Sequence, residues 1–243
     1  MREPGNLDLE EIESIEKLSL RALYTAAMDF GFDAWEVFHQ SSDDPKDVAE
    51  DITREMLDRL GGYGVSQRVF GNVDYRKARY VILPEFAVRQ ALFVDSKAEK
   101  SSTNATLQMS QLSMRVRQHR GGQNVDVPGT IAVHETYDQR SYLSTILLAH
   151  YHYEAHGSGM GKDAPPYRLL KLTLVAIPNG RLQDRYNPDH VETIWMAGRD
   201  APSRGEGFRV RLSFSALGAR ARWRVQTIEF DTNNKRTLAT WNG

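Results

Sequence analysis

The sequence predicts a single α/β domain in which helices come first and a mixed β-sheet follows. Two segments with helical periodicity occupy residues 1–62. From residue 68 onward, β-branched and aromatic residues are frequent, and turn signals separate them. The 243 residues contain no clean linker, internal repeat or low-complexity segment, and a chain of this length can bury a sizeable core as one domain.

The first expected helix covers residues 8–30. Asp8 can cap it, because Glu11 follows three residues later, and Gly31 comes directly after its end. Its apolar residues fall near helical spacing: Leu9, Ile12, Leu20, Leu23 and Ala27.

The second expected helix covers residues 44–62. Pro45 suits its first turn, and Gly61 and Gly62 end it. Its apolar residues line one face: Val48, Ile52, Met56 and Leu60.

The remaining chain is expected to be mainly strands. "RVFGNVDYRKARYVILPEF" and "QALFVDSK" precede a segment, 103–118, for which we expect a helix. Later strands are expected in "TIAVHETYD", "STILLAHYHYEAH", "YRLLKLTLVAIP", "FRVRLSFSAL" and "ARWRVQTIEFD".

Composition excludes some classes of protein and leaves others open. The chain has no cysteine, which excludes disulfides and thiolate metal sites and fits a reducing cytoplasm. No apolar run is long enough for a membrane helix, and the acidic N-terminus does not resemble a signal peptide. Net charge is −1, but residues 1–60 carry −10 and residues 61–243 carry +9, so a positive surface for nucleic acid remains open.

A carboxylate and an ammonium group follow the apolar run "ALFV". Asp95 and Lys97 are two residues apart and therefore share a face of the expected strand, and Asp74 stands near the end of another. If those strands are neighbours, two carboxylates converge beside one ammonium group. This arrangement suits Mg²⁺-dependent hydrolysis of phosphodiesters, with Lys97 orienting or polarising the attacking water. A surface ion pair is the commoner explanation of such a pattern, although the apolar run weakens it.

Two other patterns are weaker. His150, His152 and His156 are close in sequence, but no carboxylate pattern completes a zinc site, so we expect histidines that line the sheet. "GSGMGK" has the wrong spacing for a phosphate-binding loop, and Asp163 follows its lysine. We expect a hairpin loop there.

Arginines recur on the expected C-terminal strands. Arg209 and Arg211 share one strand face, and an arginine can donate two parallel hydrogen bonds to guanine in the major groove. Solvated arginines are the alternative. A second set can contact phosphates or solvent: Arg220, Arg222 and Arg224.

Several segments together resemble the SfiI-type restriction endonucleases. The similarity runs from "LDLEEIESIEKLSLRAL" and "AEDIT" through "FGNVDYRKARY" and "LFVDSKAEKS". It continues through "RLQDRYNPD", "AGRDAPSRGEGFRVRLSF" and "WRVQ" in the same order. The resemblance implies a restriction-endonuclease-like core of the PD-(D/E)xK type, with a central mixed sheet, flanking helices and additional C-terminal strands that recognise DNA.

The resemblance also implies a catalytic site and a cofactor. Asp74, Asp95 and Lys97 would be catalytic, and Asp74, Asp95 and the Ser96 backbone carbonyl would hold Mg²⁺. Val73 stands where the family pattern has proline. Glu50 is a candidate for a second metal or a water, although a solvated or capping role is the favoured interpretation.

For DNA binding, the resemblance implies residues on and before the recognition strand: Arg199, Asp200, Arg204, Arg209 and Arg211. Arg199 and Asp200 stand where the family has lysine and histidine, which leaves the exact target open. The implied target is an interrupted palindrome with GGCC half-sites, cut within the spacer to leave 3′ overhangs.

The implied partners are double-stranded DNA, further copies of the chain in a tetramer or a dimer, and a cognate DNA methyltransferase. The expected location is the prokaryotic cytoplasm. Residues 1–243 would form one endonuclease domain, with a helical part (1–62), a catalytic core (63–178) and recognition strands (179–243). A structure-specific repair or recombination nuclease and an inactive DNA-binding module are the alternatives.

Overall fold

The computed structural model describes residues 1–59, 65–68, 78–83, 86–155, 166–196 and 208–243. Its N-terminal part is helical, as the sequence predicts. Helix α1 (Leu9–Phe30) is followed by α2 (Asp33–Gln40) and α3 (Pro45–Arg59). Asp8 caps α1 by accepting the Glu11 backbone N–H, and the Glu11 side chain accepts the Asp8 N–H in return.

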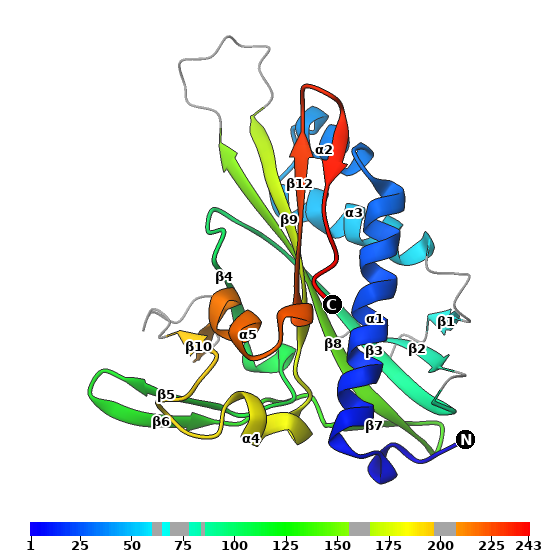
Figure 1. The fold of residues 1–243 in the computed structure, drawn as a ribbon, viewed down its shortest axis with the longest axis vertical. Helices are drawn as coiled ribbons and strands as arrows, with labels where there is room; N and C mark the ends of the chain where they lie inside the picture. The colour runs from blue at the N-terminus through cyan, green and yellow to red at the C-terminus, as the bar shows by residue number, and fades with distance from the viewer. Residues whose placement is uncertain (60–64, 69–77, 84–85, 156–165, 197–207) are drawn as a thin grey trace.

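A mixed sheet forms the centre of the molecule (Figure 1). Within the described residues it contains eight strands in the order β1-β2-β3-β8-β9-β12-β13, with β7 paired to β8. Strands β3 and β8 run parallel, and the other pairs are antiparallel. The bounds are β1 (Val65–Arg68), β2 (Ala78–Leu83), β3 (Val88–Glu99), β7 (His134–Tyr137), β8 (Arg140–Ala155), β9 (Tyr167–Ile177), β12 (Val225–Asp231) and β13 (Arg236–Leu238).

Two smaller sheets lie beside this one. The first has the order β10-β11-β4, and the second is the hairpin of β5 and β6. Their bounds are β4 (Asn104–Gln108), β5 (Val116–Arg120), β6 (Gln123–Val127), β10 (Trp195–Met196) and β11 (Arg209–Ser213). Short helices α4 (Gln183–Tyr186) and α5 (Phe214–Arg220) lie on the same side of the molecule as these sheets (Figure 1). The expected helix over 103–118 is therefore wrong, because this segment forms β4, a 3₁₀ turn and the start of β5.

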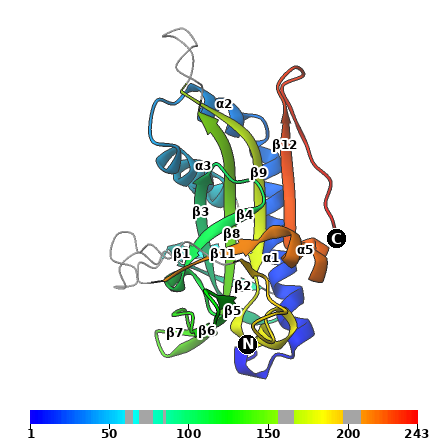
Figure 2. The ribbon, with the colours of Figure 1, turned by 90° about the vertical axis from the view of Figure 1, so that its left-hand side faces the viewer.

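The two faces of the central sheet bury different partners. Leu147, Ala149 and Tyr151 of β8 pack in a cluster with residues of α1, α2 and α3. The alternate residues Ile146 and Leu148 pack in a second cluster that contains β4 and β11. Figure 2 shows β4 and β11 crossing in front of β8 from this side.

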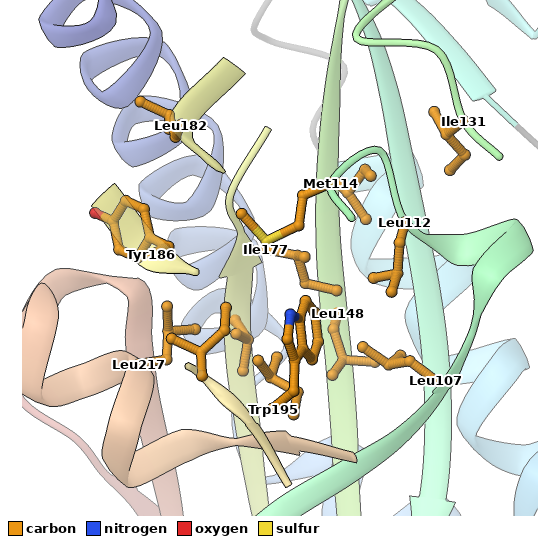
Figure 3. Close-up of a cluster of buried hydrophobic side chains, with 14 of the residues drawn as sticks. Leu107, Leu112, Met114, Ile131, Leu148, Ile177, Leu182, Tyr186, Trp195 and Leu217 are labelled. Carbon is orange, nitrogen blue, oxygen red and sulfur yellow. The ribbon is translucent and has the colours of Figure 1, made fainter. Parts of the chain in front are cut away.

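The second cluster joins the β10-β11-β4 sheet to the central sheet. In Figure 3, Leu107 of β4, Trp195 of β10 and Leu148 of β8 lie close together between the two layers. Leu107 and Leu148 are fully buried, and Trp195 is nearly so. Apolar packing of this kind is the main force that fixes the small sheet against the large one.

A buried ion pair attaches α1 to the C-terminal part of the chain. Arg224 donates to Glu16 at 2.7 Å, and both side chains are completely buried. The Asn179 backbone N–H donates to the other Glu16 oxygen at 2.7 Å. Because both charges are paired and hydrogen-bonded, their burial is tolerated.

Candidate active site

Asp95 and Lys97 lie side by side near the end of β3. Lys97 Nζ is 3.2 Å from Asp95 Oδ2, and the two side chains keep exposed fractions of 29% for Asp95 and 24% for Lys97. The alternation of a β-strand places them on one face, as the sequence predicts. Val88 and the residues Gln90 to Leu92 earlier in β3 are buried, whereas Asp95 and Lys97 are partly exposed.

The register of β3 against β8 defines which face carries the pair. Asp95 is paired with Leu148, and Lys97 with His150. Leu148 belongs to the cluster that packs against β4 and β11. Asp95 and Lys97 therefore project on the side of the central sheet where the small β10-β11-β4 sheet lies.

Burial raises the pKa of the Asp95 carboxyl group. The Lys97 charge and hydrogen bonds from Lys97 and Gln111 oppose this rise, whereas the charge of Glu50 on α3 adds to it. Asp95 Oδ2 is buried and lies 3.2 Å from Lys97 Nζ. A buried carboxylate whose pKa stays raised beside one ammonium group, near a second negative charge, is suited to bind a cation.

Asp74, the other predicted carboxylate, lies outside the described residues. The backbone near it is nevertheless informative, because β2 pairs with β3 and Ala78 lies opposite Phe93. Strand β2 therefore begins beside a residue only two positions before Asp95. Residues 78–83 are therefore neighbours of β3, and the convergence of Asp74 with Asp95 stays a prediction.

The predicted recognition arginines lie on β11. Val210 and Leu212 are fully buried, whereas Arg209 and Arg211, which alternate with them, share the opposite face and are half-buried. Arg120 of β5 donates to the Arg209 backbone carbonyl at 3.2 Å and so supports the strand. Arg199, Asp200 and Arg204 lie outside the described residues.

Two other candidate residues, His150 and Arg224, are buried in the fold. His150 is completely buried, with Nε2 3.4 Å from Glu99 Oε2. No group of three metal-ligating His, Asp or Glu side chains occurs among the described residues, and His156 and the "GSGMGK" segment lie outside them. Arg224 is buried in its ion pair with Glu16, so it is not available to DNA.

Sequence reasoning missed two residues at this site, Glu99 and Gln111. Glu99 is two positions after Lys97, so the alternation that joined Asp95 to Lys97 also places Glu99 on their face. Gln111 gave no comparable signal, because its contact with Asp95 depends on how the chain turns after β4.

Known proteins share the sequence and the fold of this chain. A family model described as "Type II restriction enzyme SfiI" matches residues 11–228. The type II restriction enzyme SfiI from Streptomyces fimbriatus is 30% identical over 247 residues, covering 97% of this chain and 90% of that enzyme.

Solved structures give the same result. The crystal structure of tetrameric restriction endonuclease SfiI bound to cognate DNA matches with a TM-score of 0.85 and 28% identity, covering 99% of this chain and 92% of that one. The restriction endonuclease BglI, bound to its recognition sequence, matches in fold with a TM-score of 0.70 and 18% identity, over 90% of each chain. The fold and the sequence together define a type II restriction endonuclease. The chain belongs to the SfiI family of these enzymes, and the resemblance inferred from the sequence is confirmed.

Helices that could span a membrane were sought in the described ranges, and none of sufficient length and apolarity occurs there.

Proposed function

We propose that this restriction endonuclease cuts double-stranded DNA by Mg²⁺-dependent hydrolysis within an interrupted palindrome with GGCC half-sites, and leaves 3′ overhangs. The observation that carries the proposal is the Asp95–Lys97 pair, which lies on the face of β3 directed toward the β10-β11-β4 sheet. A carboxylate that can hold a metal, beside an ammonium group, is the chemistry that phosphodiester hydrolysis needs.

Asp74, Asp95 and the Ser96 backbone carbonyl would hold the metal. All are oxygen ligands, which Mg²⁺ prefers, and the buried Asp95 Oδ2 meets that requirement. The start of β2 beside Phe93 supports Asp74 as the second ligand, because Ala78 is four positions after Asp74 and four extended residues span at most about 14 Å. When bound, Mg²⁺ neutralises phosphate charge and lowers the pKa of a water molecule.

Lys97 has a separate role in this proposal. Its ammonium group lies beside Asp95 and keeps a quarter of its side-chain surface exposed, so it can donate to a phosphate oxygen or to the attacking water. Glu50 acts on Asp95 through its charge and is a candidate to hold a second metal or a water.

Base recognition would come from β11 and the segment before it. Arg209 and Arg211 are placed two residues apart on one face, a spacing that suits contacts with adjacent guanines. Arg199, Asp200 and Arg204 complete the proposed DNA-binding set. Asp200 would accept a hydrogen bond from a cytosine amino group.

The solved relative supports a proposal about assembly. The structure of SfiI is described as tetrameric, and we propose that this chain also forms a homo-oligomer, a tetramer or a dimer. Residues 1–243 would act as one endonuclease domain, in the prokaryotic cytoplasm, together with a methyltransferase that protects the host DNA.

Incubating DNA with the protein and Mg²⁺, and sequencing the fragment ends, tests the proposal. The expected result is discrete fragments whose ends share one interrupted G·C-rich palindrome, with no cutting in EDTA. Preference for branched DNA would instead indicate a repair nuclease, and binding without cutting would indicate an inactive module. Either result would contradict the proposal.

A further inference from the structure

Strands β3 and β4 belong to different sheets, yet two side chains join them. The first is Glu99 at the end of β3, whose carboxylate accepts the Thr106 backbone N–H of β4 at 3.1 Å. Buried His150, 3.4 Å away, lies against the same carboxylate. Although burial opposes it, contacts with His150 and Thr106 lower the pKa of Glu99, so this group is ionised at neutral pH.

The second connection is Gln111. Its side-chain oxygen accepts the Gln108 backbone N–H at 2.9 Å, at the other end of β4. The Gln111 side chain also lies close enough to Asp95 to lower the pKa of its carboxyl group. One side chain therefore contacts both the proposed metal ligand and the backbone of β4.

Both backbone groups lie on the outer edge of β4. Strand β4 pairs with β11 along its inner edge, and alternate N–H groups of an edge strand point away from its partner. We refer to the contacts of Glu99 with Thr106, and of Gln111 with Asp95 and Gln108, as the β3–β4 bridge.

The register of β4 against β11 connects the β3–β4 bridge to the proposed recognition arginines. Thr106 lies opposite Arg211, and Gln108 lies opposite Arg209. The two residues of β4 that the bridge holds are therefore the two that pair with the proposed recognition arginines. Any shift of β11 on DNA would move Thr106 and Gln108 of β4, and through them Glu99 at the end of β3 and Gln111 beside Asp95.

We propose that Glu99 and Gln111 are positioning residues that couple base recognition on β11 to the cleavage site on β3. The proposal rests on the roles assigned above to Asp95, Lys97, Arg209 and Arg211. In it, correct bases fix β11 and β4, and the bridge then sets the position of Asp95. Incorrect bases leave β4 displaced and Asp95 misplaced, and small misplacements of a reacting group are costly to rate.

Apolar packing makes this role separable from folding. Ala105 and Leu107, which alternate with Thr106 and Gln108, are completely buried in the cluster that joins the two sheets. Removing the bridge leaves this packing in place. We therefore expect Glu99→Ala and Gln111→Ala to fold and to bind DNA.

The test measures single-turnover cleavage and DNA dissociation constants on two duplexes. One carries the site that the wild-type enzyme cuts, and the other carries one substituted base pair in a half-site. The variants are Glu99→Ala, Glu99→Gln, Gln111→Ala and the Glu99→Ala, Gln111→Ala double variant. Glu154→Ala is the control, because Glu154 is an equally charged but half-exposed residue of β8 that pairs with half-exposed Arg168. Thermal melts report folding.

We expect Glu99→Ala and Gln111→Ala to lower the cleavage rate on the correct site by roughly 5- to 150-fold, the usual range of coupling between sites. Binding should stay close to wild type, and the ratio of correct to incorrect cleavage should shrink. Glu99→Gln keeps an acceptor for Thr106 N–H and should recover most of the rate. The double variant should lose less than the product of the two single losses.

Equal losses of cleavage rate on both duplexes, which leave the ratio of correct to incorrect cleavage unchanged, would overturn the coupling. Glu99→Gln as inactive as Glu99→Ala would also overturn it, and would indicate that the carboxylate charge itself takes part in the chemistry. If Glu99→Ala fails to fold, Glu99→Gln and Gln111→Ala decide the question. A wild-type chain that cuts no DNA would instead refute the proposed function, so the two failures are distinguishable.

Discussion

Lys97 Nζ lies 3.2 Å from Asp95 Oδ2 near the end of β3, a strand whose earlier residues are mostly buried. The ion pair does not fully compensate the burial of the carboxylate, since the pKa of Asp95 remains raised. A bound cation would therefore stabilise the ionised form of the Asp95 carboxylate.

Asp95→Asn should abolish Mg²⁺-dependent cleavage and leave DNA binding largely intact. Burial raises the pKa of Asp95 in the folded chain above its value in the unfolded chain. The protonated carboxyl group therefore favours folding at low pH, and this stabilisation is lost as the pH rises through the folded pKa. At neutral pH the substitution should therefore raise the free energy of unfolding, by about 1 kcal/mol. Urea unfolding, a binding assay in EDTA and a cleavage assay measure the three effects.

The control for that variant is Asp51→Asn, because Asp51 is an exposed residue of α3 paired with Arg54. It should leave both cleavage and stability unchanged. Undiminished cleavage by Asp95→Asn would remove Asp95 from the site.

Lys97→Gln should raise the pKa of Asp95 further, since the Lys97 charge and hydrogen bond now lower it. A carbon-13 NMR titration of the Asp95 carboxyl group measures this. The wild-type midpoint should lie above the ordinary Asp value of about 3.9, and the variant midpoint higher still. Lys235→Gln, which removes an exposed lysine paired with Glu36, should not move it. A lower midpoint in Lys97→Gln would contradict the pairing.

Arg209→Ala should reduce base discrimination by about 1–3 kcal/mol at one position of the site, if Arg209 makes a bidentate contact with guanine. Cleavage rates on the correct duplex and on duplexes with single substitutions measure it. Arg168→Ala, a half-exposed arginine of β9, is the matched control. A loss equal on all sequences would reassign Arg209 to phosphate contact.

Glu16→Ala should lower the free energy of unfolding by about 3–5 kcal/mol, because it removes the 2.7 Å partner of the buried Arg224 charge and leaves it only the longer contact with Glu13 at 3.4 Å. Urea unfolding followed by circular dichroism measures it. Glu10→Ala, on the same helix but exposed and paired with Arg185, should have little effect. Similar losses in the two variants would show that the buried pair has no special role.

Local signals made some elements predictable. The Asp8–Glu11 capping box and the apolar spacing defined α1, and Pro45 marked the start of α3. Helix α2 was missed because it follows Gly31 almost at once and is only eight residues long.

The helix expected over 103–118 was wrong for a physical reason. Ala105 and Leu107 are buried and alternate with Thr106 and Gln108, which is a strand period, but Leu112 lies at a spacing that also fits a helix. Pairing with β11, a hundred residues later, decides the outcome, and no local window contains that information.

The residues of the candidate site also differ in whether local sequence could predict them. Asp95 and Lys97 were predictable because strand alternation is local, and Glu99 follows from the same rule. The roles of Gln111 and His150 depend on contacts between sheets, which the sequence does not display.

The position of a bound divalent ion decides whether Asp95 and Asp74 together form the cleavage site. A crystal structure of the enzyme with its DNA and Ca²⁺ in place of Mg²⁺ would show that position. We expect an ion bound by the carboxylates of Asp95 and Asp74, with Lys97 Nζ beside the phosphate to be cut. An ion bound elsewhere, or an Asp74 carboxylate remote from Asp95, would contradict it.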